Sequence, residues 1–573
     1  MRKIILFLVI IVSVALNAQT KLVKLRAEEP NLLYFHELNG KAYFFAKNSY
    51  GYELWVTDGS PTGTYMMKDI NKNGSSGPRL LHKYENKLYF TANDGINGYE
   101  LWSTDGTADG TQMVRDLNST GSTNIYQFLN LNGGLLFVAN NVTRGTELWI
   151  TYGTYSGTFL IKDINPNGSS QIDEITVFNG KIYFKADDGT NGHELWVSDG
   201  NGSGTQMVKN INPSGNSSPT LLKVCNNKLF FLANDGTHGY QVWVSDGTTN
   251  GTKMVKEINV GSNKYFSNFT EFNGKIYFST DDGTHGVEPW VTDGTASGTY
   301  MIKDINPNGH SFPSHFYEFK GKLYFNADSK DPYAGKELWV TDGTTAGTKV
   351  VSSLHYQGGV YDPNRFIEMN GELYFSALTE NDGRELMKTD GTASGTKMVK
   401  NINTKAYEGS NPEVFYVFNN KLYFRASDGS NGWELWGSDG TTAGTVKLAP
   451  DISPNKSPLF NTTLFRVFNN ELYFEASFDS NGLVLWKLND LPTSVSETVH
   501  LNITISPNPI KDILYIQSEY EINKVSLISI SGQTLQTWHK STDINLSHFE
   551  NGIYLVCLTT SKGNVVKKII KST

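Results

Sequence analysis

Residues 337–348 read ELWVTDGTTAGT, and close variants of this stretch recur along most of the chain. The tryptophan of the motif returns at intervals of 47 residues five times and then at intervals of 48 to 50 residues. We number the ten resulting units 1 to 10 by the residue at this position: Trp55, Trp102, Trp149, Trp196, Trp243, Trp290, Trp339, Met387, Trp436 and Trp486. A fixed period of this length indicates a repeat architecture.

Each unit contains four strand-like pieces, which we call a, b, c and d. In unit 4 they are Thr176–Phe178, Lys181–Ala186, Glu194–Val197 and Gln206–Ile211. Asn179 and Gly180 join a to b, and because both residue types accept positive φ they predict a two-residue hairpin. Piece b is apolar on both faces, which predicts burial between neighbouring units. Four short antiparallel strands in about 40–50 residues match a propeller blade.

The predicted fold is therefore all-β: a β-propeller of about ten four-stranded blades. Unit 10 has no piece d, whereas the segment Lys21–Leu25 resembles one. We expect this N-terminal strand to complete unit 10 and so to remove two exposed sheet edges. The uninterrupted spacing favours one ring. Two five-bladed rings are the alternative, and an open solenoid is a third arrangement.

The two ends of the chain indicate export. Residues 1–18 read as a signal peptide, with Arg2 and Lys3 before the apolar run Ile4–Leu16 and cleavage after Ala18. A membrane anchor is the alternative, although 13 apolar residues are short for a bilayer. The remaining chain divides into a repeat domain at 19–490, a polar linker at 491–502 that suits proteolytic cleavage, and a C-terminal domain at 503–573.

Composition narrows the function classes. The chain has 49 basic and 57 acidic residues, a net charge of −8, which gives no electrostatic reason to expect nucleic acid or an anionic membrane as partner. Only two cysteines occur, Cys225 and Cys557, and their positions suggest no disulfide. An exported chain without disulfides must draw its stability from a buried core.

The repeat resembles the ELWxxDGT repeat of secreted bacterial proteins, a group often labelled hyalin-like. The resemblance covers roughly Lys21–Asp490 and implies a β-propeller-like surface protein without a settled biochemical activity.

The C-terminal segment resembles a type A sorting domain of the type IX secretion system of Bacteroidetes. Ser506 departs from the aromatic residue that the family often has before its Pro-Asn-Pro motif. The positions that carry the sorting signal are Pro507, Asn508, Pro509, Gly532, Gly552, Tyr554 and Lys568. The resemblance implies handling by the type IX machinery, passage through the periplasm, and anchoring to surface lipopolysaccharide or release. By its own pattern of alternating strands and turns, the segment reads as a β-sandwich.

Residues that recur in many units are more often structural than catalytic. A glutamate of piece c and a basic residue of piece d, such as Glu194 and Lys209, lie 15 residues apart in six units. We expect them to form cross-strand ion pairs and not to act as catalytic acids.

Departures from the repeat are the better places to look for a site. The richest is the d-to-a connection that enters unit 8, with His355, Tyr356, Tyr361, Asp362 and Arg365. Aromatic rings beside polar groups can stack on a sugar and hydrogen-bond its hydroxyls. The plainer interpretation is an ordinary variable loop.

No cofactor is expected from the sequence. The loops at residues 187–189 and 281–283, each Asp-Asp-Gly, offer oxygen ligands for Ca²⁺, but a tight turn requires the same residues without any metal. The chain shows no motif of a nucleophile elbow, a zinc helix or a nucleotide-binding loop.

The sequence thus predicts an exported, non-enzymatic β-propeller that serves as a binding or interaction scaffold for a glycan or protein. The alternatives are an extracellular carbohydrate-active enzyme, which requires paired carboxylates or a His/Tyr/Arg cluster at the ring centre, and a structural surface or adhesion component.

Overall fold

The computed structural model describes residues 21–258, 265–329, 335–351, 361–379, 381–430, 432–448, 465–476, 483–489, 503–529, 534–560 and 563–572. These residues form strands and connections, without a helix among them. Two compact parts divide the chain, one at Leu22–Leu488 and one that begins at Asn489. The expected signal peptide and the linker at 491–502 lie outside the described residues. Within the described ranges, no helix is long and apolar enough to span a membrane.

Strands of the first five units succeed one another in the order a, b, c and d. They are β1 (Lys21–Leu38), β2 (Lys41–Asn48), β3 (Gly51–Thr57), β4 (Tyr65–Lys68), β5 (Arg79–Tyr84), β6 (Lys87–Asn93), β7 (Tyr99–Thr104), β8 (Gln112–Arg115), β9 (Asn124–Leu131), β10 (Gly134–Asn141), β11 (Gly145–Thr151), β12 (Thr158–Lys162), β13 (Asp173–Phe178), β14 (Lys181–Asp187), β15 (His193–Ser198), β16 (Gln206–Lys209), β17 (Thr220–Cys225), β18 (Lys228–Asn234), β19 (Tyr240–Ser245) and β20 (Lys253–Lys256).

Units 6 to 10 repeat this order. Their strands are β21 (Phe266–Phe272), β22 (Lys275–Asp281), β23 (Val287–Thr292), β24 (Tyr300–Met301), β25 (Ser314–Phe319), β26 (Lys322–Asp328), β27 (Lys336–Thr341), β28 (Lys349–Val350), β29 (Tyr361–Met369), β30 (Glu372–Thr379), β31 (Gly383–Thr389), β32 (Lys397–Lys400), β33 (Glu413–Phe418), β34 (Lys421–Ala426), β35 (Glu434–Ser438), β36 (Val446–Lys447), β37 (Arg466–Phe468), β38 (Glu471–Ala476) and β39 (Val484–Asn489).

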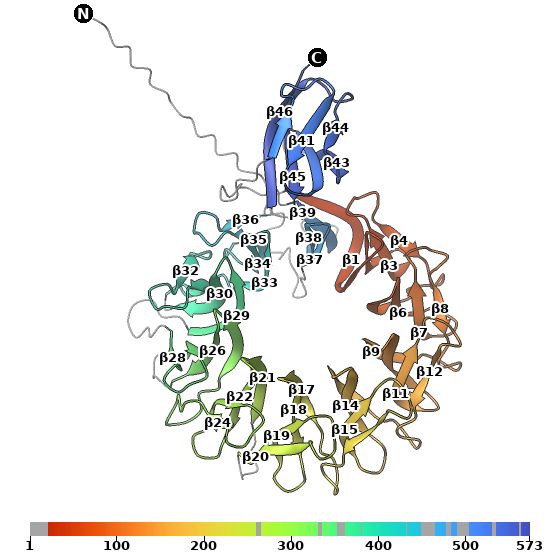
Figure 1. The fold of residues 1–573 in the computed structure, drawn as a ribbon, viewed down its shortest axis with the longest axis vertical. Helices are drawn as coiled ribbons and strands as arrows, with labels where there is room; N and C mark the ends of the chain where they lie inside the picture. The colour runs from red at the N-terminus through yellow and green to blue at the C-terminus, as the bar shows by residue number, and fades with distance from the viewer. Residues whose placement is uncertain are drawn as a thin grey trace, which may run out of the picture. The chain divides into compact units, whose positions relative to one another are not determined.

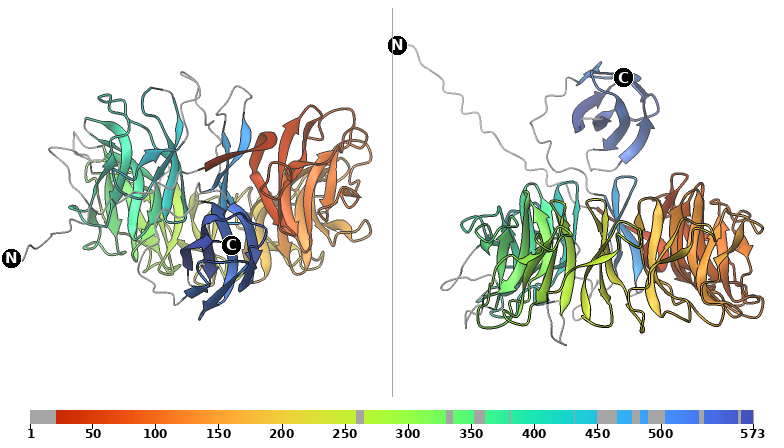
Figure 2. Two further views of the ribbon diagram at one scale, coloured as in Figure 1. Left: turned by 90° about the horizontal axis from the view of Figure 1, so that it is seen from above. Right: turned by 60° about the horizontal axis from the view of Figure 1, so that its bottom comes forward.

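Each of units 2 to 9 is one four-stranded antiparallel sheet. The a–b hairpin forms as its residues predict, because Asn179 and Gly180 adopt φ of 49° and 70°. Figure 1 shows the sheets following one another around a circle, with first strands such as β9, β17, β21 and β29 toward the inside and fourth strands such as β8, β12, β20 and β28 on the outside. Figure 2 shows their strands running from one face of this circle to the other.

Strand β1 links the end of the repeat to its beginning. It lies between β39 and β2 in a seven-stranded sheet of order β37-β38-β39-β1-β2-β3-β4. The Glu29 amide donates to the Leu483 carbonyl at 2.7 Å, and the Leu32 amide donates to Glu475 Oε1 at 2.7 Å. This pairing confirms that the N-terminal strand supplies the missing fourth strand of unit 10.

Neighbouring units bury their apolar faces against each other. Phe184 and Trp196 of unit 4 pack in one cluster with Leu136 and Ile150 of unit 3, and equivalent clusters join the other units. The tryptophans of units 1 to 7 and 9 are only 5–7% exposed. A single unit would leave these rings in water, so the array depends on stacking.

The motif residues hold the turns and the junctions. Asp199 Oδ1 accepts the Asn201 amide at 2.9 Å, and a Cβ on Gly204 would lie only 2.1 Å from the same oxygen. A Cβ on Gly247 would lie 2.2 Å from the Tyr183 hydroxyl of the preceding unit. The same contact joins Tyr473 of unit 10 to the first motif glycine of unit 1, Gly59, where the distance is 2.6 Å.

The prediction of ion pairs between pieces c and d is wrong. Leu195, not Glu194, lies opposite Lys209, because a bulge between Leu195 and Trp196 shifts the register by one residue and so reverses the sheet face. Glu194 is fully buried and accepts the Ile211 amide at 2.8 Å and the Ser217 hydroxyl at 2.7 Å. The glutamate therefore anchors the d-to-a connection of its own unit.

The basic residue of piece d instead joins its unit to the next one. Lys209 Nζ donates to the Thr252 carbonyl at 2.7 Å and lies 5.8 Å from the centre of the Trp243 ring. The same two contacts recur for Lys162, Lys256, Lys303 and Lys400 with the following unit. Each lysine thus connects adjacent units through a hydrogen bond and a cation–π contact.

The C-terminal part contains two further antiparallel sheets, of order β40-β41-β44 and β43-β42-β45-β46. Their strands are β40 (Ile503–Ser506), β41 (Ile513–Ser518), β42 (Ile522–Ser529), β43 (Thr534–His539), β44 (Asp543–Asn545), β45 (Gly552–Thr560) and β46 (Gly563–Lys571). One buried cluster contains residues of both sheets, among them Leu514, Leu527, Val556 and Ile569. Both cysteines of the chain, Cys225 and Cys557, are free.

Candidate functional site

Three positions in each unit vary although the surrounding motif repeats. We call them the edge positions: the residue of strand a that pairs with strand b just before a bulge, its partner on strand b, and the residue of strand c just before the motif glutamate. In unit 7 they are Ser314, Asn326 and Lys336. They lie on one sheet face, near the b–c loop, because directly paired and diagonal residues of antiparallel strands share a face.

The edge positions change chemistry from unit to unit. In unit 2, Arg79 lies over the ring of Tyr99 at 4.9 Å, and in unit 4, Lys185 pairs with Asp173 at 3.2 Å. In unit 5 all three positions are uncharged: Thr220, Leu232 and Tyr240. The repeated residues thus build a common frame on which each unit displays its own edge.

A β-bulge follows the first edge position and directs one more side chain toward the next unit. The bulged residue has positive φ without being glycine, 57° at Glu174 and 58° at both His315 and Arg365. Glu174 Oε2 accepts the Leu221 amide of unit 5, and Arg365 Nη2 lies 2.8 Å from Glu413 Oε2 of unit 9. Bulges commonly re-aim side chains in this way.

Units 7, 8 and 9 carry a continuous set of charged and polar side chains along these edges. Asn326 Nδ2 of unit 7 donates to the Pro363 carbonyl of unit 8 at 3.0 Å. Arg384 holds Asp362 through the carbonyl at 2.9 Å and through the carboxylate at 2.5 Å. In unit 9, Glu413 also pairs with Arg425.

His315 and Lys336 share one electrostatic environment with the predicted residues. Desolvation lowers the pKa of His315; the charge of Lys336 lowers it too, Asp362 raises it, and Arg365 lowers it. Desolvation also lowers the pKa of Lys336, whereas Asp362 raises it. Lys336 Nζ donates to the Ser314 hydroxyl at 3.2 Å, so its ammonium group is held at the edge of unit 7.

Of the binding residues predicted from the sequence, the structure places three. Tyr361, Asp362 and Arg365 lie on β29; Tyr361 is half-buried, and Arg365 is exposed. Asp362 and Arg365 contact different partners, Arg384 and Glu413. His355 and Tyr356 lie outside the described residues.

Sequence reasoning missed the partners that other strands bring to these residues, namely His315, Lys336, Arg384, Glu413 and Arg425. A signal for two of them was present. Lys336 and Arg384 stand before the motif glutamate, where units 2 and 5 have Tyr99 and Tyr240. A comparison of the same position across units would have found them.

The Asp-Asp-Gly loops use their carboxylates to hold turns. Asp187 Oδ1 accepts the Gly189 amide at 2.7 Å, and Asp188 Oδ1 accepts the amides of Thr190 at 2.9 Å and Asn191 at 2.7 Å. Among the described residues, no group of three or more His, Cys, Asp or Glu side chains is placed to hold a metal ion.

The expected sorting residues join the two ends of the C-terminal part. Asn508, between Pro507 and Pro509, donates through Nδ2 to the Lys568 carbonyl at 3.0 Å and accepts the Ile570 amide at 2.8 Å. Gly552 begins β45, and the Tyr554 hydroxyl donates to the Glu550 carbonyl at 2.8 Å. Gly532 lies outside the described residues.

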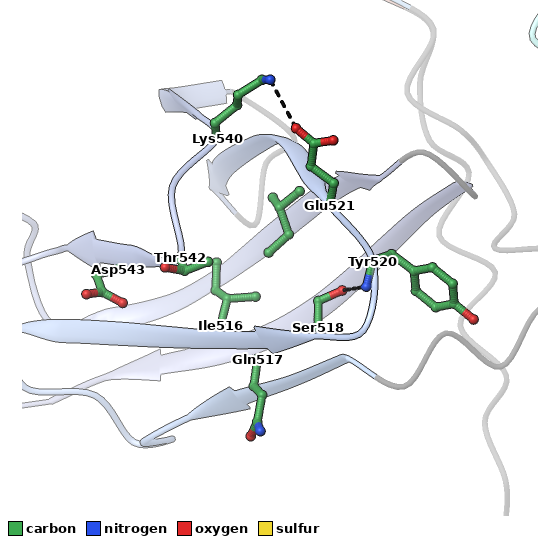
Figure 3. Close-up of a pocket in the computed structure, with 9 residues that line it drawn as sticks. Ile516, Gln517, Ser518, Tyr520, Glu521, Lys540, Thr542 and Asp543 are labelled. Atoms are coloured by element: carbon green, nitrogen blue, oxygen red, sulfur yellow. Dashed lines mark hydrogen bonds and ion pairs between the residues drawn. The ribbon is translucent and has the colours of Figure 1, made fainter.

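A hollow of about 510 Å³ lies elsewhere on the C-terminal part, and Figure 3 shows the side chains around it. Lys540 Nζ lies 3.0 Å from Glu521 Oε1, and the Ser518 hydroxyl accepts the Tyr520 amide at 3.0 Å. The ion pair is strongly exposed, and the lining includes none of the expected sorting residues.

Several solved structures resemble the chain at low sequence identity. A puromycin hydrolase is 11% identical with a TM-score of 0.27, and the match covers 61% of this chain and 58% of the hydrolase. The extracellular domain of a hybrid two component system of B. thetaiotaomicron is 12% identical with a TM-score of 0.27 over 96% of this chain and 78% of that domain. A prolyl endopeptidase is 11% identical with a TM-score of 0.30, and the match covers 62% of this chain and 54% of that enzyme.

Comparison with curated proteins found no match to the chain. Among protein families, the secretion system C-terminal sorting domain matches residues 504–572, the segment in which Asn508 clamps the last strand. The chain therefore ends in a type IX sorting domain and is secreted to the cell surface or the extracellular space by that machinery.

Proposed function

We propose that the chain is a secreted binding scaffold, whose repeated interior holds the sheets and whose variable edges bind an extracellular glycan or protein. The observation that carries this proposal is the contrast between buried motif residues, which join neighbouring units, and edge positions, which differ between units. Structural constraints alone do not explain why unlike charged groups gather at the edges of three successive units, 7, 8 and 9.

We further propose one closed ring of ten blades for the repeat part, belonging to the ELWxxDGT group, and a β-sandwich for the C-terminal part. The insertion of β1 between β39 and β2 supports closure, as does the contact between Tyr473 and Gly59. A signal peptide at residues 1–18 and a bacterial source in the Bacteroidetes complete the proposal.

A binding role suits the edge residues better than catalysis. The carboxylates of Asp362 and Glu413 are each paired with arginine, so both are already engaged in ion pairs within the protein. The buried motif glutamates hold backbone amides, so they too lack access to a substrate.

The direct test is retention of the purified full chain on glycan and protein arrays. We expect binding to a limited set of ligands, and loss of that binding when Asp362 and Arg384 are exchanged together for Asn and Gln. Absence of any retained ligand would contradict the binding role. Turnover of a retained glycan would instead favour a carbohydrate-active enzyme.

A further inference from the structure

The edge of units 7 and 8 brings cationic side chains of two successive units together. Three cationic side chains, those of Lys336, Arg365 and Arg384, come from three strands, β27, β29 and β31. They gather on a chain whose net charge is −8. Such a basic group on an acidic protein attracts anions locally, whereas the remaining surface repels them.

The charges of this group are only partly compensated. Asp362 pairs with Arg384. Desolvation lowers the pKa of Lys336, while the charges of Asp362 and Asp328 oppose that lowering. Arg365 pairs with Glu413, yet its side chain remains 50% exposed. Lys336 donates to a neutral hydroxyl, that of Ser314. With Arg425, which shares Glu413 with Arg365, four cations face the three carboxylates of Asp328, Asp362 and Glu413, so the edge has room for additional negative charge.

The neighbouring groups favour a sugar over a peptide as the carrier of that charge. Tyr361 lies half-buried at the start of β29, and on unit 9 the half-buried Trp433 ring lies 4.8 Å from the Arg425 guanidinium. Aromatic faces stack on sugar rings, while the planar guanidinium of arginine matches the two oxygens of a carboxylate. Successive units present these groups side by side, as a polymer of repeated acidic sugars requires.

We propose that the edge of units 7 and 8 binds a carboxylate-bearing polysaccharide, with Lys336 and Arg365 contacting successive uronic acid carboxylates. This inference rests on the binding role proposed above and names its ligand class. Arg384 contributes to the positive potential of the edge, and Tyr361 supplies a stacking face.

The test measures the affinity of the full chain for polygalacturonate by affinity electrophoresis, with neutral dextran and poly-glutamate as comparison ligands. The double variant Lys336→Gln, Arg365→Gln should bind polygalacturonate at least tenfold more weakly. The matched control Lys253→Gln removes an exposed cation from β20, the fourth strand of unit 5, which holds no edge position, and should bind as the unchanged chain does. Binding should also weaken as salt is added, because the contacts are ionic.

Each outcome separates this inference from the general binding role. Equal affinity of the double variant and the unchanged chain overturns the inference. Tighter binding of poly-glutamate than polygalacturonate overturns it in favour of an acidic protein partner. Binding of dextran or other array glycans alone overturns the acidic ligand but leaves the scaffold role standing. The melting temperature of each variant, which should match that of the unchanged chain, excludes misfolding as the cause of a loss.

Discussion

The junction between units 4 and 5 and the junction between units 7 and 8 use opposite means. In the first, Lys209 contacts the ring of Trp243 and the Thr252 carbonyl, and the facing edge of unit 5 is uncharged. In the second, Met387 replaces the tryptophan, and the edge holds His315, Lys336 and Arg365. The motif tryptophan is therefore replaced at a junction where unlike charges gather.

This difference indicates how a repeat protein can acquire a binding site. Repeated residues contribute mainly to stability, since each unit rests on its neighbours. A binding residue has to differ between units if it is to recognise one ligand at one place. Substitutions inside the junctions should therefore change stability, whereas substitutions at the edge should change binding, and the following experiments test this division.

The largest effect is expected from removing residues 22–27, the part of β1 that precedes its pairing with β2. The deletion takes Leu25 and Ala27 out of a core in which they are at most 1% exposed and leaves β39 with an open edge. At about 1.5–3 kcal/mol for each large buried side chain, including Leu22 and Val23, the loss is on the order of 5 kcal/mol. Calorimetry should show a lower melting temperature, and a peptide of residues 21–28 should restore it. An unchanged melting temperature would refute closure by this strand.

The buried motif glutamates should make stability depend on pH. Burial raises the pKa of Glu100, Glu147, Glu288 and Glu385 from 4.5 to about 7. Between these values the folded chain binds more protons than the unfolded chain, so their stabilising contribution is complete below about pH 4.5 and is lost as the pH rises through 7. Each pKa unit corresponds to about 1.4 kcal/mol per group.

Exchange of all four glutamates for glutamine should remove most of this pH dependence. Glutamine already occupies the position in unit 5, where Gln241 Oε1 accepts the Ile258 amide at 3.1 Å. Urea unfolding at pH 5 and pH 8 measures the change. If the urea midpoint of the wild-type chain is no lower at pH 8 than at pH 5, the glutamates are not protonated in the folded chain.

A smaller loss should follow from Lys209→Ala, which removes one hydrogen bond to a carbonyl and one cation–π contact. We expect about 2 kcal/mol, because both contacts are partly desolvated. Lys253→Ala, an exposed lysine on the next d strand, serves as the matched control and should change stability by no more than about 0.5 kcal/mol. Equal effects of the two substitutions would mean that the contact with Trp243 does not join the units.

The same two regions show how far the sequence alone could predict the molecule. The hairpins, the buried tryptophans and the pairing of the N-terminal strand follow from local residue types and from the repeat period. The partners of Glu194 and Lys209 could not be predicted in this way, because one bulge beside Trp196 changes the register and no turn-forming residue marks that bulge in the sequence. The pairing of Arg365 with Glu413 depends on residues 48 positions apart in the chain, so only the stacking of units reveals it.

The smallest effect on stability, and the sharpest test of the division, is expected at Arg365. Its side chain is half exposed, and its ion pair with Glu413 bridges two units at the surface, where such pairs contribute about 0–1 kcal/mol. Glu413 keeps Arg425 as a partner when Arg365 becomes glutamine, so no carboxylate is left unpaired. Arg365→Gln should therefore change the free energy of unfolding by no more than about 0.5 kcal/mol while it weakens ligand binding. A large loss of stability would mean that Arg365 has a structural role. The division between structural junctions and binding edges would then fail at this residue.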